Sequence, residues 1–169
     1  MDEETVEARG LEPIRAELDA VAAVASPAEL LRLSGELQRV GVSGLVNGGA
    51  LHDAGDPSRM LLHLVQGGLG LPDESYYREE SYADILAQYT AHVGAVLARA
   101  GIGGDEAESV ALGERVVALE TRIAATHWDV VRSRDAVARY NLLSRRQPPA
   151  LFPLAPARPA GIGAGGRKA

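Results

Sequence analysis

Two stretches of this sequence keep apolar residues at helical spacing over several turns, and they constrain the fold more than any other feature. The first covers residues 82–100, and the second starts near Asp105 and ends at about His127. Side chains three and four positions apart share one face of a helix, so both stretches predict amphipathic helices. The short glycine-rich link at 101–104 favours an antiparallel pair. The residues that we expect on the buried face of the second helix are Val110, Val117, Ile123 and Ala124.

Two shorter helices are expected nearer the N-terminus. Residues 13–24 place apolar side chains at three- and four-residue spacing, which predicts a short amphipathic helix. The next helix has a clear start, because Ser26 can cap it, Pro27 suits its first position and Glu29 completes a capping box. Gly41 is a typical residue to end it.

The region between these helix pairs predicts a small β-hairpin. Residues 45–51 and 60–66 flank a turn cluster at 53–57, and a glycine-rich connection follows at 67–80. Aromatic residues make up only 4% of the chain, so the core must consist of aliphatic side chains, which suit helices. The predicted fold class is therefore mainly α, with amphipathic helices and one small β-hairpin.

Composition excludes several classes of site. The chain has no cysteine, which excludes disulfides, thiolate metal sites and cysteine nucleophiles. No apolar run approaches the ~20 residues of a membrane span, and the acidic start does not resemble a signal peptide. These features predict no membrane segment and, by default, a cytoplasmic location. Residues 132–169 are basic, but their cations are scattered with few aromatic residues between them, so nucleic-acid binding is not predicted.

The end of the chain changes character. Residues 148–169 hold five prolines and four glycines without helical or strand periodicity, which predicts a disordered tail. Residues 161–166 match the letters of a G-x-G-x-x-G motif. A dinucleotide site needs a strand before the motif and a helix after it, and this segment offers neither. Nucleotide binding is therefore not predicted.

Several polar groups have the residue types of a site but favour structural roles instead. The glycines of 67–70 suit a tight connection with a positive φ before Pro72 better than an anion cradle. His127 and Glu120 are expected to form a hydrogen-bonded pair between packed helices, and His92 to lie at the edge of the core. Acidic residues at helix starts favour the helix dipole. These acids are Glu79, Glu80, Asp105, Glu106 and Glu108.

Several segments, in order along the chain, resemble one protein family. The stretch GGLGLPDESYY at 67–77 resembles the QGGLGLPDRDYY segment of neprilysin-type and endothelin-converting-enzyme-like zinc metalloendopeptidases. The acidic start at 1–21, the helix at 82–101, the LE-x-x-I-A pattern at 119–124 and the R-D…Y-N pattern at 134–141 are similar to further family segments. The resemblance covers about residues 1–144. It implies a helical N-terminal region that helps to cap a catalytic cleft and to limit substrate size.

The departures from this family concern its chemistry. Family catalysis rests on H-E-x-x-H, in which two histidines one helical turn apart bind zinc and the glutamate activates water. The four histidines here are His52, His63, His92 and His127, and the closest two are eleven residues apart. None is followed by glutamate, and the N-A-[FY] segment that binds substrate backbone is also missing. We therefore predict no catalytic, cofactor-binding or metal-ligating residue in this chain.

Residues 1–147 are thus expected to be part of a neprilysin-like N-terminal region, with 148–169 as the tail. The resemblance implies zinc and peptide substrates for a full-length member, whereas this chain alone is predicted to be inactive and without a cofactor. The tail composition suggests an interrupted reading frame. Three alternatives stay open: a stand-alone helical module that binds a catalytic lobe or a second copy, a non-functional remnant, and catalysis with a zinc site on a separate chain.

Overall fold

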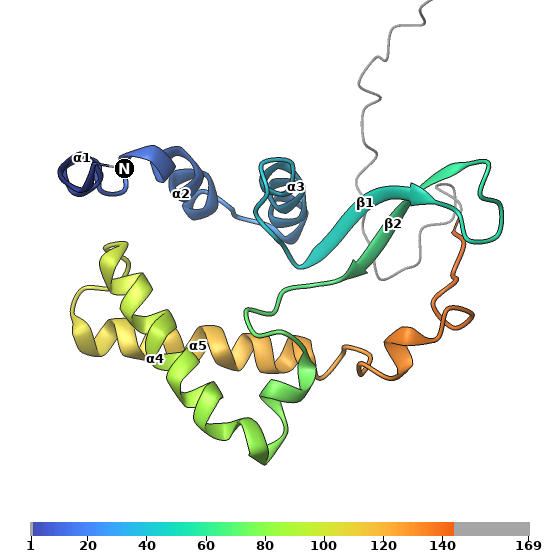
Figure 1. Ribbon diagram of the computed structural model, residues 1–169. Coiled ribbons are helices and arrows are strands. Elements are labelled where there is room, and N and C mark those ends of the chain that lie inside the picture. The colour runs from blue at the N-terminus through green and yellow to red at the C-terminus, as the bar shows by residue number, and fades with distance from the viewer. Residues whose placement is uncertain (1, 144–169) are drawn as a thin grey trace, which may run out of the picture.

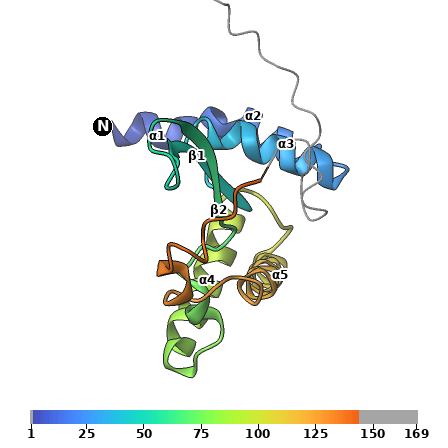
Figure 2. The ribbon, with the colours of Figure 1, turned by 90° about the vertical axis from the view of Figure 1, so that its right-hand side faces the viewer.

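The computed structural model describes residues 2–143, which form two groups of helices joined through a β-hairpin and a glycine-rich connection (Figure 1). In both views α1 to α3 lie on one side, and α4 with α5 lies on the other (Figure 2). The predicted fold class is confirmed. The tail and the G-x-G-x-x-G segment lie outside the described residues. The elements are α1 (Glu3–Arg9), α2 (Arg15–Ala22), α3 (Pro27–Gln38), β1 (Val46–His52), β2 (Met60–Gln66), α4 (Ala83–Arg99) and α5 (Glu106–Ala124), with short 3-10 turns η1 (Glu12–Ile14), η2 (Glu74–Tyr77), η3 (Glu80–Tyr82) and η4 (Arg132–Arg134).

The helix pair α4 and α5 crosses at two buried glycines. A Cβ added to Gly113 would lie 2.9 Å from the backbone nitrogen of Gly94 and 2.9 Å from the carbonyl oxygen of Thr90. A Cβ added to Gly94 would lie 3.1 Å from the carbonyl oxygen of Ser109. The two backbones therefore touch directly, which packs the helices closer than larger side chains at the crossing would allow.

Helix starts follow the capping patterns in the sequence. Ser26 Oγ accepts a hydrogen bond from the backbone N–H of Glu29 at 3.3 Å, while the Glu29 carboxylate accepts from Ala25 N–H at 2.8 Å. At α5, Asp105 Oδ1 accepts from Glu108 N–H at 2.8 Å, and Glu108 accepts from Gly104 N–H at 2.6 Å. Both pairs satisfy backbone donors that a helix start otherwise leaves unpaired.

The predicted hairpin is confirmed as an antiparallel pair. Leu62 lies opposite Ala50, and Leu64 lies opposite Gly48, so these residues share one face of the sheet. That face is open: Met60 is 54%, Leu62 72% and Leu64 47% exposed. The strand MLLHLVQ reads as an almost continuous apolar run, which is typical of strands covered on both faces.

Several details of the helices differ from the sequence-based expectations. Helix α1 was missed because its sequence EETVEAR carries a single large apolar residue and no stripe. Helix α5 ends at Ala124, three residues before His127. Val110 is 49% exposed, because Gly113 and Ser109 occupy the crossing with α4 instead. His92 lies exposed rather than at the core edge.

None of the helices within residues 2–143 combines the length and the apolar character that a bilayer span requires.

Candidate functional site

A tyrosine anchors the glycine-rich connection between the hairpin and α4. Tyr77, which is 6% exposed, accepts hydrogen bonds at its hydroxyl oxygen from the backbone N–H groups of Gly70 at 3.2 Å and Leu71 at 3.0 Å. The same hydroxyl donates to Glu120 Oε2 at 2.8 Å. Upstream, Gly68 adopts φ +84°, the left-handed conformation that glycine tolerates best. The prediction of a tight, positive-φ connection is confirmed.

Glu120 connects this loop to both long helices. Its second carboxylate oxygen, Oε1, accepts a hydrogen bond from the hydroxyl of Tyr89 on α4 at 3.1 Å. Burial is the main cause that raises the pKa of Tyr77 to about 12, with the Glu120 carboxylate as a further cause. Burial, followed by the negative charge of Glu120, also raises the pKa of Tyr89. Both tyrosines are therefore held in the neutral form and act as hydrogen-bond donors at physiological pH.

This arrangement decides between the two interpretations of the 67–70 loop. An anion cradle needs free N–H groups that point at the ligand. Here the N–H groups of Gly70 and Leu71 already donate to the Tyr77 oxygen. A Cβ at Gly70 would also collide with the Tyr89 hydroxyl. The loop is thus shaped by the two tyrosines, and the geometry favours the structural role.

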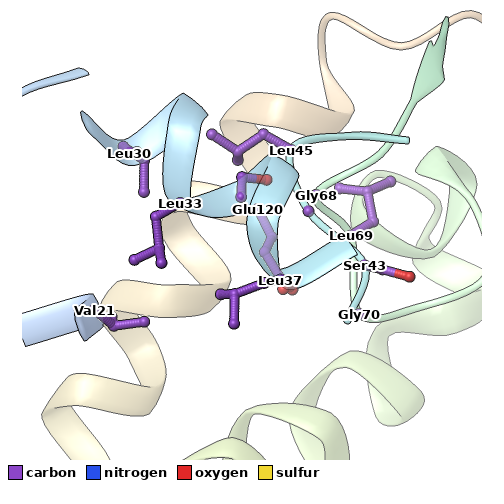
Figure 3. Close-up of a pocket in the computed structure, with 12 residues that line it drawn as sticks. Val21, Leu30, Leu33, Leu37, Ser43, Leu45, Gly68, Leu69, Gly70 and Glu120 are labelled. Carbon is purple, nitrogen blue, oxygen red and sulfur yellow. The ribbon is translucent and has the colours of Figure 1, made fainter. Parts of the chain in front are cut away.

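An apolar pocket lies between α3 and α5, next to this network (Figure 3). Its volume is about 330 Å³. The carboxylate-bearing Glu120 lies among aliphatic side chains in the close-up, with the backbone of Gly68–Gly70 at one side. The aliphatic residues that line the pocket are Val21, Leu30, Leu33, Leu37, Leu45 and Leu69.

The sequence did not predict the meeting of Tyr77, Tyr89 and Glu120. It placed each of them in a segment of family resemblance but did not predict that they contact one another. One signal was present: Glu120 follows Val117 by three positions and so falls within the apolar stripe of α5. A carboxylate on a buried helix face requires hydrogen-bond donors nearby, and the two hydroxyls supply them.

The expected pairing of His127 with Glu120 is not formed. His127 Nε2 lies 3.1 Å from the carbonyl oxygen of Gly67, beyond the end of α5. Next to it, the Gln66 amide donates to Trp128 O at 3.1 Å and accepts from Trp128 N–H at 3.1 Å. These contacts fasten the segment after α5 to the base of the hairpin. His127 turns away because α5 ends three residues earlier than expected.

The segment that follows α5 also contacts the hairpin tip, where Tyr140 meets Asp53. Asp53, which is 1% exposed, accepts hydrogen bonds from Gly55 N–H at 2.9 Å and Arg59 Nε at 2.5 Å. The hydrogen bond from the Gly55 N–H is the main cause that lowers the pKa of Asp53. The Arg59 guanidinium and the Tyr140 hydroxyl lower this pKa further, each with a smaller effect. Asp135 accepts from the N–H groups of Val137 and Ala138 at 2.9 and 3.0 Å and shapes the turn before Tyr140. Asp135 and Tyr140 of the R-D…Y-N pattern therefore have structural roles.

The four histidines lie on different elements. His52 contacts the carbonyl oxygen of Pro57 at 3.0 Å, and His63 on β2 has a buried Nε2 without a hydrogen-bond partner among the described residues. His92 projects from α4, and His127 follows α5. Within residues 2–143, no three side chains of the histidine, aspartate and glutamate type gather as a metal would require. The donor set of these residues does not fit a zinc ion.

A second hollow, of about 340 Å³, lies beside the end of α5. Its charged wall includes Glu74 and Arg78, whose side chains form an ion pair at 2.5 Å. Asp129 also lines it, but Asp129 Oδ1 accepts a hydrogen bond from Arg132 N–H at 2.7 Å and so caps the following turn. His127, Trp128 and Asp129 are thus all engaged in structural contacts.

Comparisons with known proteins complement this geometry. The family model for the N-terminal region of peptidase family M13 matches residues 1–157. The cryo-EM structure of the Mycobacterium tuberculosis zinc metalloprotease Zmp1 in its open state is 42% identical, with a TM-score of 0.79 over 86% of this chain. The crystal structure of Zmp1 with an inhibitor is also 42% identical, with a TM-score of 0.75 over 80% of this chain. No match to a curated protein was found.

This sequence spans only part of these relatives, namely 22% and 20% of the two Zmp1 chains. The match nevertheless extends over most of this chain. An identity of 42% indicates membership of the same family and not only a shared fold. The family match continues to residue 157, ten residues past the predicted domain boundary at 147, which stays a prediction. The resemblance inferred from GGLGLPDESYY and the segments around it is confirmed, and the chain belongs to peptidase family M13.

Proposed function

We propose that this segment is a non-catalytic part of the lobe that caps the cleft of an M13 zinc metalloendopeptidase, where it helps to limit substrate size. The observation that carries the proposal is its 42% identity to about a fifth of a zinc metalloprotease. The Tyr77–Glu120–Tyr89 network, which holds the glycine-rich loop against α4 and α5, supports a structural role. Zinc and peptide hydrolysis belong, in this proposal, to the whole protein.

The hairpin supplies the surface through which the segment would dock. Met60, Leu62 and Leu64 form an exposed apolar row on one face, opposite the small residues Ala50 and Gly48. Large apolar patches of this kind mark contact sites with other protein surfaces. The rest of the peptidase polypeptide, about four-fifths of the length of the relatives, is the cover that we assign to this face.

A chimera tests the proposal. Residues 2–143 replace the matched segment of Zmp1, and the chimera is assayed for chelator-sensitive cleavage of short peptides and of large unfolded proteins. We expect cleavage of the peptides and exclusion of the large chains. A zinc-loaded chimera that cleaves both substrates equally well would contradict the capping role.

The docking face is tested by Leu62→Ser in two settings. In the isolated chain the side chain is 72% exposed, so the change should alter stability by less than about 0.5 kcal/mol. In the chimera, where the face would be covered, the same change should cost about 2–3 kcal/mol, as removal of a buried large apolar side chain does. Equal small effects in both proteins would refute the assigned surface.

A second function, a stand-alone interaction module, is favoured by the same exposed row. Two copies could cover each other through Met60, Leu62 and Leu64. Sedimentation velocity of the isolated chain distinguishes these outcomes: a discrete dimer that Leu62→Ser dissociates supports the module. A monomer with cooperative thermal unfolding supports the capping segment. Polydisperse aggregation without a cooperative melt supports a non-functional remnant.

A further inference from the structure

The pocket between α3 and α5 combines aliphatic walls with one carboxylate. Leu33 and Leu37 of α3 face it from one side, and Glu120 of α5 from the other (Figure 3). The volume of about 330 Å³ is at the small end of the range for ligand pockets. A pocket of this size and lining suits a slender apolar stem with a polar end group.

Glu120 sets the charge of that end group. Among residues 2–143, the ion pairs do not include Glu120, and its described hydrogen bonds come from the hydroxyls of Tyr77 and Tyr89. Each carboxylate oxygen can accept more than one hydrogen bond, so one accepting position per oxygen is left. A carboxylate in a partly apolar setting is stabilised most strongly by a cation, because the surroundings screen the attraction less than water does.

We propose that this pocket receives the side chain of a lysine presented by the remaining polypeptide of the M13 peptidase. The four-carbon stem of lysine would lie along the leucines, and its ammonium group would donate to the Glu120 oxygens. An arginine is less suited, because its planar fork pairs best with a carboxylate whose two oxygens are both free. The inference rests on the proposed function for the origin of the lysine.

The test uses the full chain in solution. Nα-acetyl-lysine N-methylamide is titrated while the backbone amide signals of Leu45, Gly68 and Gly70 are followed by NMR. Nα-acetyl-norleucine N-methylamide is the comparison ligand, since it has the same stem length and no charge. A single side chain of this size should bind with a dissociation constant in the millimolar range.

We expect the lysine derivative to bind roughly tenfold more tightly than the norleucine derivative, as a hydrogen bond to a charged group suggests. Glu120→Gln should remove this preference. Glu114→Gln, which removes the same charge from an exposed position of α5, should retain it. If Glu120→Gln does not fold, the preference of the unchanged chain for the lysine derivative over the norleucine derivative still tests the proposal.

Equal affinity for both derivatives, or no shift of the three amide signals up to the solubility limit, would overturn the lysine assignment. Binding of n-butylammonium without binding of the lysine derivative would also overturn it and would assign the pocket to a free amine. None of these results would affect the proposed capping role, because the chimera tests that role independently.

Discussion

The close crossing of α4 and α5 predicts an unusual effect for a glycine-to-alanine change in a helix. Alanine normally stabilises a helix interior by about 1 kcal/mol relative to glycine. At Gly113 the new Cβ would lie 2.9 Å from two backbone atoms of α4, those of Gly94 and Thr90. Backbone atoms cannot rotate away as side chains do, so the two helices must separate.

The magnitude follows from opposing effects. Overpacking a close contact costs about 1–3 kcal/mol, and three backbone contacts at 2.9–3.1 Å place Gly113→Ala at the upper end. After subtraction of the gain in helix propensity, the net loss is about 2 kcal/mol. For a chain of this length, that loss lowers Tm by about 4–8 °C.

Gly35 of α3 provides the matched control. A Cβ there meets nothing within 4 Å, so Gly35→Ala should gain up to about 1 kcal/mol. Thermal and urea unfolding followed by circular dichroism at 222 nm measure both variants against the unchanged chain. If Gly113→Ala proves as stable as Gly35→Ala, the reasoning on the backbone-to-backbone crossing is wrong.

Further predictions concern the polar networks. Tyr89→Phe removes the donor to one Glu120 oxygen and should cost about 1.5–3 kcal/mol in urea unfolding; a loss below about 0.5 kcal/mol would count against the network. Burial raises the pKa of Tyr77 to about 12 from an ordinary value of 10.0. The stabilising contribution of Tyr77 is therefore complete below pH 10 and disappears as the pH rises through 12. Tyr77→Phe should flatten this alkaline loss of stability, and an unchanged dependence of stability on pH would refute the role of Tyr77. Asp53 has a pKa lowered from 3.8, so its contribution to stability is present above that pH and is lost as the pH falls. Asp53→Asn should reduce the loss of stability in acid and speed amide exchange at the hairpin tip. Unchanged amide exchange at the tip would contradict this role of Asp53. Asp105→Ala removes the cap of α5 and should cost about 1 kcal/mol, and Asp105→Ser should recover most of it.

The sequence predicts the local features of this fold well because their causes are local. Ser26 with Glu29 and the turn cluster after β1 mark element boundaries through interactions that span a few residues. The meeting of Tyr77 with Glu120 spans 43 residues and depends on how the loop docks onto α5, which no periodicity encodes. A glycine inside a helix usually weakens it, whereas Gly113 permits backbone-to-backbone contact between the two helices, which the sequence alone does not reveal.

The family resemblance was carried by residues that have structural reasons. Tyr77 holds the glycine-rich loop, and Tyr140 meets Asp53 at the hairpin tip. Such residues identify a fold even where a chain lacks the catalytic residues of its family. They do not report on chemistry, so the absence of H-E-x-x-H is a separate observation from the resemblance.

The most direct test of the central claim, that this segment contributes packing and not catalysis, is the zinc content of the purified chain together with its peptidase activity. After equilibration with zinc and removal of the excess, we expect far less than one equivalent of zinc and no chelator-sensitive cleavage of peptides. Zinc near one equivalent per chain, together with cleavage that a chelator stops, would contradict the account.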